Sequence, residues 1–207
     1  LKLGVVGQAR RRTIQFSMLQ SWRALVYGRC MGRLEKSDWL DFALGQLAEK
    51  GHAALKAQTL AAGLGVTRGS FYWHFDDLDA FKRDLIAHWA ARTTAELLNA
   101  TVREHDAEAQ LRGLLRRSLR SGGALERAVR AWATADLHVA DHVSAVDWRR
   151  IRFAEKLLGA LGVPEAGIGP RARVLYWAAI GRLMVARPEE LQLSEADIDG
   201  IARMLMS

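Results

Sequence analysis

The sequence predicts an all-α protein. Alanine, leucine and arginine are abundant, and the 207 residues include only 3 prolines, a composition that favours helices over turn-rich sheets. Half of the residues are hydrophobic, enough to build a core, and many recur at the three- and four-residue spacing of amphipathic helices. No segment of any length shows the apolar–polar alternation of a strand.

The nine expected helices are bounded by recognisable start and stop signals. Ser37 or Asp38 can cap the first helix and Gly51 can end it, while Asp76 or Asp77 can cap the fourth. Pro170 suits a first helical turn, and Ser194 with Asp197 has the spacing of a capping box. The expected ranges are about 37–50, 56–63, 67–73, 78–104, 108–121, 125–137, 143–161, 170–186 and 194–206.

The basic charge of the chain is confined to its N-terminal part. The formal net charge is +7, and residues 1–36 supply all of it with eight basic residues and one acidic residue. The sequence begins with Leu1, and Met18 and Met31 are both possible starts. We expect residues 1–36 to be a disordered basic extension or the result of a misplaced gene start. The competing interpretation is a basic arm that reaches DNA phosphates or the minor groove.

Composition also limits the classes of function. The single cysteine, Cys30, excludes an internal disulfide framework and a multi-cysteine zinc site. No window approaches the roughly 20 apolar residues of a transmembrane helix, so we expect a soluble, cytoplasmic protein without a membrane partner.

Residues 55–75 have the spacing of a helix-turn-helix motif. Two short helices flank Gly65, where the chain must turn sharply, and Leu60, Leu64 and Phe71 are spaced to face one another. The second helix of such a motif lies in the DNA major groove. The alternative is an ordinary helical hairpin with a glycine turn.

The exposed residues of the second helix suit DNA contact. Thr67 can cap the helix and donate to a phosphate, and Arg68 can pair with guanine or bind a phosphate. Gly69 and Ser70 are small residues, which allow the helix to approach DNA closely. Tyr72 and His74 can donate hydrogen bonds to phosphate oxygens.

The string from Gly65 to Phe75 resembles the signature of TetR-type transcriptional regulators, as does its setting over about residues 38–90. The segments 131–133, 147–150 and 171–176 resemble the helical effector domain of that family more loosely. The resemblance implies a three-helix DNA-binding head at 37–85 and a helical ligand-binding and dimerisation domain at 86–207. It also implies a homodimer on a palindromic double-stranded DNA operator, released by a small-molecule effector as a repressor would be.

The resemblance assigns roles residue by residue. Phe71 and Phe75 match the buried side of the recognition helix. The matching surface consists of Thr67, Arg68, Ser70, Tyr72, Trp73 and His74. Lys56 departs from the pattern, because the family often has a threonine there that caps the helix. Lysine cannot accept the backbone N–H bond, although it can still meet a phosphate.

The C-terminal half holds candidates for an effector pocket. These are Trp132, His138, Trp148, Phe153, Trp177 and Met184, which can equally serve core or dimer packing. A run of arginines can bind an anionic effector or form a solvated helix face: Arg116, Arg120, Arg127 and Arg130. The last two helices carry apolar stripes that predict an intersubunit four-helix bundle, or else they close the core of one chain.

No catalytic, metal or cofactor site is expected. His138 and His142 lie four residues apart, but a metal site needs at least one more converging ligand. No phosphate-binding loop, nucleophile elbow or plausible cysteine nucleophile is present. The alternatives to an effector-controlled regulator are a helical dimeric interaction or architectural module without an effector, and a small helical enzyme.

Overall fold

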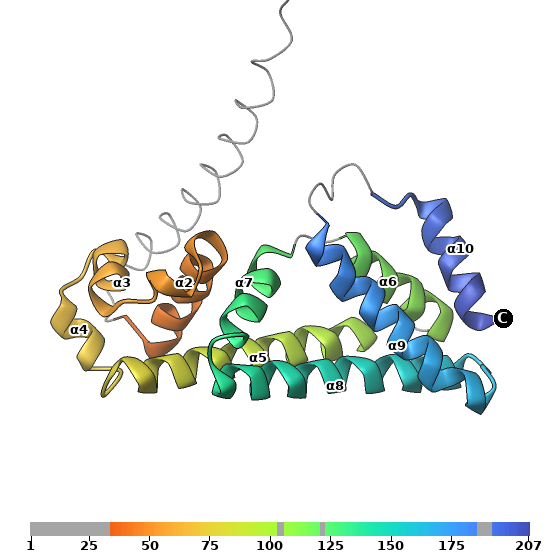
Figure 1. Cartoon of the computed structure of the whole chain (residues 1–207), viewed down its shortest axis with the longest axis horizontal. Coiled ribbons are helices and arrows are strands. Elements are labelled where there is room, and N and C mark those ends of the chain that lie inside the picture. Colours follow the sequence, from red (N-terminus) through yellow and green to blue (C-terminus); the bar gives the residue numbers. More distant parts are fainter. Residues whose placement is uncertain (1–33, 103–105, 121–122, 186–191) are drawn as a thin grey trace, which may run out of the picture. The chain divides into compact units, whose positions relative to one another are not determined.

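The computed structural model describes residues 34–102, 106–120, 123–185 and 192–207, and every regular element within these ranges is a helix (Figure 1). The chain divides into two units, residues 1–36 and residues 37–207. The expectations for residues 1–30 and for Cys30 lie outside the described residues. None of the described helices is both long enough and apolar enough to cross a membrane.

The helix-turn-helix region forms as the sequence predicts. It contains α2 (Lys36–Lys50), the 3-10 turn η1 (His52–Ala54), α3 (Ala57–Leu64) and α4 (Arg68–Tyr72). The turns depend on glycines in the left-handed region, Gly51 with φ 73° and Gly65 with φ 71°. Side chains with a Cβ rarely adopt this conformation, so these two positions fix where α2 and α3 end.

Two helix starts in this region carry no side-chain cap. Lys56 occupies the N-cap of α3 in an extended conformation and its side chain accepts no cap bond, as the departure at this position implies. Thr67 occupies the N-cap of α4, but its hydroxyl makes no cap hydrogen bond either, contrary to the role expected from the sequence. Phe71, near the other end of α4, is fully buried beneath the helix.

A single long helix leads out of the motif. Helix α5 (Leu78–Val102) begins where Asp77 Oδ1 accepts a hydrogen bond from the Ala80 N–H at 2.6 Å. Its N-terminal half buries Phe81, Leu85, Ile86 and Trp89. The remaining helices are α6 (Ala107–Arg120), α7 (Ala124–Ala133), α8 (Leu137–Ala160), α9 (Glu165–Gly181) and α10 (Glu195–Met206), with the 3-10 turn η2 (Arg182–Met184) after α9.

The C-terminal helices share one core. Helix α8 lies along α5, α9 packs on α8, and α10 packs on α6 (Figure 1). Buried leucines and isoleucines of four helices meet there, including Leu115, Leu158, Leu175 and Ile198. Because Ile198, Ala202 and Leu205 are buried, the apolar stripe of α10 closes the core of its own chain. Met204 of the same helix is 61% exposed, so the predicted intersubunit bundle stays a prediction.

Three predicted helix boundaries were wrong. Helix α7 ends at Ala133 and not near Leu137. Asp136 caps α8, accepting from the N–H groups of His138 and Val139, so this helix starts at Leu137 and not near Val143. Helix α9 starts at Glu165 after Pro164, which places Pro170 inside the helix and not in its first turn. The capping box of Ser194 and Asp197 forms as predicted.

Candidate DNA-binding surface and ligand cavity

Helix α4 rests on a cluster of aromatic rings. Phe71 is fully buried, and its ring lies edge-on to Trp39 of α2 at a centroid distance of 5.5 Å. The rings of Phe75 and Phe81 lie 5.0 and 5.2 Å from Phe71. Such contacts add to the free energy of burial and restrict side-chain rotation. The five-residue α4 is therefore held in place by its neighbours.

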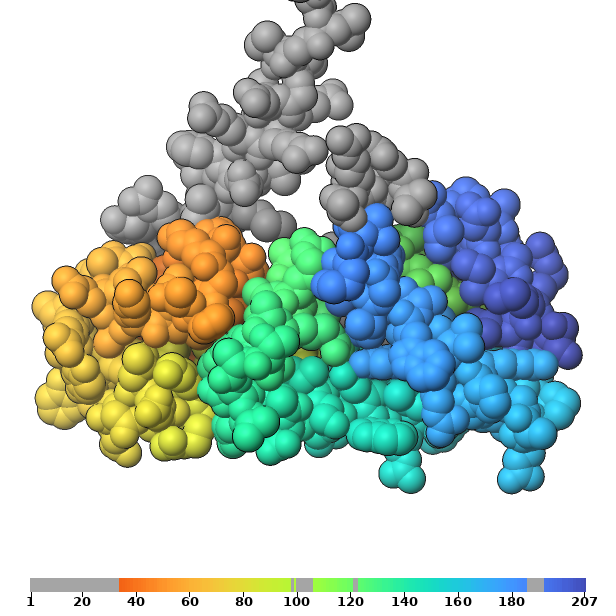
Figure 2. Space-filling model, in the orientation of Figure 1, coloured from red at the N-terminus to blue at the C-terminus, as the bar shows by residue number. Residues whose placement is uncertain are grey.

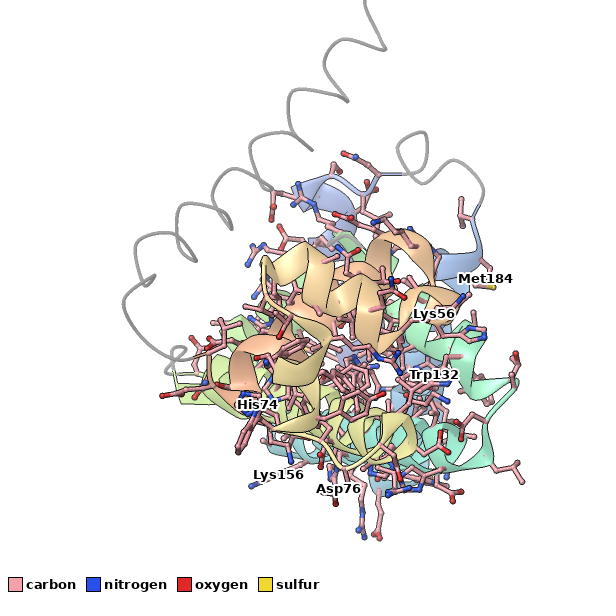
Figure 3. All side chains as sticks on the ribbon, turned by 90° about the vertical axis from the view of Figure 1, so that its left-hand side faces the viewer. Lys56, His74, Asp76, Trp132, Lys156 and Met184 are labelled. Carbon is pink, nitrogen blue, oxygen red and sulfur yellow. The ribbon has the colours of Figure 1, made fainter. Side chains whose placement is uncertain are left out.

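The opposite side of α4 faces outward and carries the predicted DNA-contact residues. Arg68 donates from Nη2 to the Tyr72 hydroxyl at 3.0 Å, and its guanidinium lies 5.6 Å from the centre of the Tyr72 ring. Trp73 is 77% exposed. Lys56, Thr67 and Gly69 are exposed, whereas Ser70 and His74 are half-buried. Figure 3 views this end of residues 37–207 and labels Lys56 and His74.

This surface has positive charge and exposed rings. Residues 55–75 contain Lys56 and Arg68 and no acidic residue. The Tyr72 hydroxyl holds the Arg68 guanidinium along the outward face of α4, beside the exposed Tyr72 ring. Arginine in this position suits either guanine or phosphate oxygens.

A cavity of about 360 Å³ lies among the C-terminal helices. Its size is within the range of small-molecule sites, roughly 300–1,000 Å³. Helices α5, α6, α8 and α9 supply most of its walls, with contributions from α7 and η2. The lining residues are Thr93, Glu96, Leu97, Leu114, Arg117, Ser118, Gly123, Glu126, Arg150, Ala154, Leu175, Tyr176, Ala179, Ile180, Arg182 and Leu183.

None of the six residues predicted for an effector pocket lines this cavity. Trp132 is buried and Phe153 is half-buried in core packing, while the ring of His138 is exposed beside His142. Trp148, Trp177 and Met184 are 55%, 62% and 70% exposed. The six predicted residues therefore remain a prediction for an effector site, and the cavity brings together a different set of side chains.

The physical reason is the phase of the helices. Tyr176 and Leu183 line the cavity, whereas their immediate neighbours Trp177 and Met184 point outward. Successive side chains on a helix diverge by about 100°. The large aromatic and apolar residues that the sequence singles out on α9 and η2 therefore lie on a different face from the residues that line this cavity.

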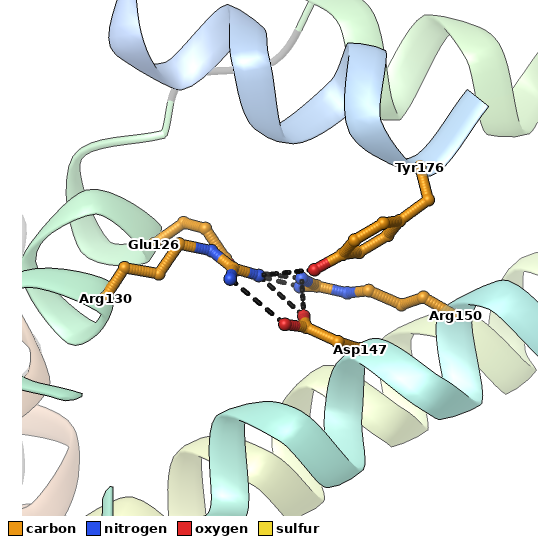
Figure 4. Close-up of polar contacts among 5 residues, drawn as sticks. All are labelled: Glu126, Arg130, Asp147, Arg150 and Tyr176. Atoms are coloured by element: carbon orange, nitrogen blue, oxygen red, sulfur yellow. Dashed lines mark hydrogen bonds and ion pairs between the residues drawn. The ribbon is translucent and has the colours of Figure 1, made fainter. Parts of the chain in front are cut away.

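A polar network forms part of the cavity wall (Figure 4). Arg150 donates to both carboxylate oxygens of Glu126 at 2.9 Å. Arg130 donates to both oxygens of Asp147, at 3.0 and 2.6 Å, and also lies 2.8 Å from Glu126. The Tyr176 hydroxyl accepts from Arg130 at 3.4 Å. Two guanidiniums, two carboxylates and a phenol thus connect α7, α8 and α9.

The network shifts the ionisation of its members. Burial alone raises the pKa of Glu126, but hydrogen bonds and charges from Arg150 and Arg130 outweigh it and hold the pKa below its ordinary value. Burial, with a hydrogen bond to Asp147, raises the pKa of Tyr176 to about 12. Glu126 is therefore ionised and Tyr176 protonated at neutral pH.

The arginine run identified in the sequence is divided among different structural roles. Arg116 and Arg120 both pair with Glu195 and so connect α6 to the start of α10. Arg130 belongs to the network, and Arg127 is exposed. These arginines do not converge on one anion site. Among the described residues, no group of three or more potential metal ligands is found, so His138 and His142 are not joined by a third ligand.

Comparison with known proteins agrees with this geometry. Residues 40–85 match the family model described as bacterial regulatory proteins, tetR family. No curated protein matches the sequence.

Solved structures match over most of the chain. A transcriptional regulator of the TetR/AcrR family has a TM-score of 0.68 at 18% identity, over 83% of this chain and 98% of that one. A transcriptional regulator from Rhodococcus sp. Rha1 has a TM-score of 0.64 at 16% identity, over 84% and 96%. A TetR transcription regulator from Haloarcula marismortui has 0.63 at 16% identity, over 82% and 93%. Residues 40–85 thus match the tetR-family model, and the chain shares the fold of these solved TetR-type structures.

Proposed function

We propose that the protein is a sequence-specific DNA-binding transcriptional regulator. The observation that carries this proposal is the outward face of α4, where Arg68, Tyr72 and Trp73 are presented on a rigid aromatic base within the family-matched segment. Helix α4 lies in the major groove, and its N-terminal residues reach base edges. In this proposal the head comprises residues 37–85 and the regulatory domain residues 86–207.

The DNA contacts are divided between positioning and reading. Arg68 reads a guanine, and Thr67 donates to a phosphate. Lys56, Tyr72, Trp73 and His74 contact the backbone. Gly69 and Ser70 lack the bulk that keeps α4 away from the groove.

The protein acts as a homodimer on a palindromic operator. Trp177 and Val174 lie one turn apart on α9 and are both exposed, and the nearby Ala178 and Gly181 are small and exposed. This face of α9 suits close packing against the same helix of a second copy. Two recognition helices then occupy half-sites roughly 34–36 Å apart, or a multiple of that distance.

The cavity binds a small-molecule effector that releases the repressor from DNA. Helix α5 supports this proposal, because Phe81 and Leu85 pack in the head while Thr93 and Leu97 line the cavity. An effector shifts DNA affinity only by binding the two head spacings with different affinity.

Selection of genomic DNA fragments at near-physiological salt tests the proposal. The full chain and a variant starting at Met31 are each incubated with sheared DNA, and bound fragments are sequenced. We expect fragments that share one inverted repeat. Unselective, steeply salt-dependent recovery contradicts it and favours a helical architectural or interaction module without an effector.

A further inference from the structure

The cavity combines an apolar body with two polar groups of residues. Its apolar walls include Leu97, Leu114, Ala154, Leu175 and Ile180. One polar group contains Glu126, Arg150 and the Tyr176 hydroxyl, connected through Arg130. The other contains Arg117, Ser118 and Arg182, where Arg182 Nε donates to the Ser118 carbonyl at 3.3 Å.

The charges on the cavity wall favour an anion. Three lining guanidiniums, Arg117, Arg150 and Arg182, stand against two lining carboxylates, Glu96 and Glu126. Glu96 also lies 3.6 Å from Arg92, a cation outside the lining. The lining residues therefore carry one more positive than negative charge, which favours a negative ligand.

Arg150 already forms the geometry that a carboxylate ligand requires. Its two terminal nitrogens each donate to one oxygen of Glu126 at 2.9 Å, which is the planar two-bond pairing of arginine with carboxylate. Glu126 thus occupies the position of a ligand carboxylate. Glu126 already has a second cationic partner besides Arg150, because Arg130 Nη2 lies 2.8 Å from Glu126 Oε1.

Exchange of partners leaves every charge of this partly buried network with a counter-charge. If Arg150 turns to a ligand carboxylate, Glu126 keeps Arg130, and Arg130 keeps Asp147. A neutral ligand gives Arg150 no anionic partner in exchange for Glu126, so the same movement breaks a partly buried ion pair without replacing it.

We propose that the cavity binds an amphipathic monocarboxylate, an apolar molecule with one carboxylate, and that Arg150 receives this carboxylate in place of Glu126. The exchange releases α7 from α8 at Glu126. Since α7 also packs against η1 of the head, the release gives the ligand a route to the DNA-binding surface. Only this regulatory consequence rests on the proposed function.

Calorimetric titration of the full chain without DNA tests the assignment. The probes are octanoate and 4-phenylbutanoate, each compared with its primary amide. We expect each acid to bind about tenfold more tightly than its amide, because hydrogen bonds to a charged group exceed those to a neutral one by roughly this amount. Equal binding of acid and amide, or binding of neither, overturns the proposal.

Two variants, with a third as control, test whether Arg150 binds the ligand carboxylate. Arg150→Gln should lose the preference for acids, whereas Arg152→Gln, at an exposed position on the same helix, should keep it. Glu126→Gln retains Arg150 but withdraws its internal competitor, so octanoate should bind more tightly than to the wild type. Weaker octanoate binding by a folded Glu126→Gln protein, or an unchanged preference in Arg150→Gln, overturns the proposal. Because no DNA is present, these results are independent of whether the chain recognises an operator.

Discussion

At the scale of single residues, we expect glycine to stabilise the head at one position and to destabilise it at another. Gly65 adopts φ 71° between α3 and α4, a conformation that costs other residues about 1–2 kcal/mol. Gly45 lies inside α2, where an added Cβ meets nothing within 4 Å. We expect Gly65→Ala to lower the free energy of unfolding by about 1 kcal/mol and Gly45→Ala to raise it by up to about 1 kcal/mol. Urea unfolding at one protein concentration measures both, and changes of the same sign contradict this account.

Arg68 is the residue whose replacement should change sequence preference. If it pairs with guanine, Arg68→Ala should cost about 1–3 kcal/mol at one operator base pair and relax the preference there. Arg83→Ala removes an exposed arginine from α5, outside α4, and should leave the preference unchanged. Binding measured against operators substituted at each position distinguishes the two. An Arg68→Ala protein with wild-type preference excludes base reading by this residue.

The sequence predicted residue placement well only where a pattern fixed the helix phase. In the motif, the spacing around Gly65 places Phe71 inside and Arg68 outside, and the family resemblance places Phe75 inside, as the structure has them. In the cavity, no such pattern exists. The lining residues Arg150 and Tyr176 have nothing in their local sequence that separates them from their exposed neighbours Arg149 and Trp177.

At the scale of elements, helix ends were predictable where a side-chain cap has a sequence signature. Ser194 and Asp197 show the capping spacing, and both reciprocal bonds form. Asp136 also caps a helix, but no acidic or amide partner three residues later marks it, so the start of α8 was missed. For α9, Pro170 resembled a first-turn proline, although Pro164 holds the true helix start.

The capping box at α10 should contribute measurably to stability. The Ser194 hydroxyl accepts from the Asp197 N–H at 3.2 Å, so Ser194→Ala removes a cap bond. We expect the free energy of unfolding to fall by about 1 kcal/mol. Ser144→Ala, at an exposed position inside α8, is the matched control and should raise it slightly because alanine favours helix interiors. Equal effects of the two substitutions, measured by urea unfolding, argue against the cap.

At the scale of the whole molecule, the head and the cavity are connected along two helices. Asp41 of α2 lies 2.8 Å from His88 Nε2 and 3.2 Å from Arg92 Nη1, both on α5. Helix α7 makes a second connection, from the network at Glu126 to η1. A rearrangement of the cavity wall can therefore reach the head through both α5 and α7.

The network should make stability depend on acid pH. The pKa of Glu126 is lowered in the folded state, so its ionisation stabilises the fold above the ordinary value of 4.5, and this contribution is lost as pH falls through the lower folded value. In Glu126→Gln, the free energy of unfolding should fall less steeply below pH 4.5 than in the wild type. The exposed Glu165→Gln should keep the wild-type dependence. Identical slopes for Glu126→Gln and wild type rule out this contribution.

The proposed operator geometry requires a dimer, and we expect the exposed face of α9 to form its interface. Trp177 and Val174 leave a large apolar surface uncovered within one chain, and α9 reaches the face of the molecule drawn in Figure 2. A charge placed there must be desolvated at a dimer interface, so Trp177→Glu should convert the dimer into a folded monomer. Leu137→Glu is the matched control, because Leu137 is 85% exposed at the start of α8, and this variant should stay dimeric. Sedimentation measures all three proteins, with a chain mass of 23.0 kDa as reference. A dimeric Trp177→Glu protein places the interface elsewhere, and a monomeric wild type removes the basis for two linked half-sites.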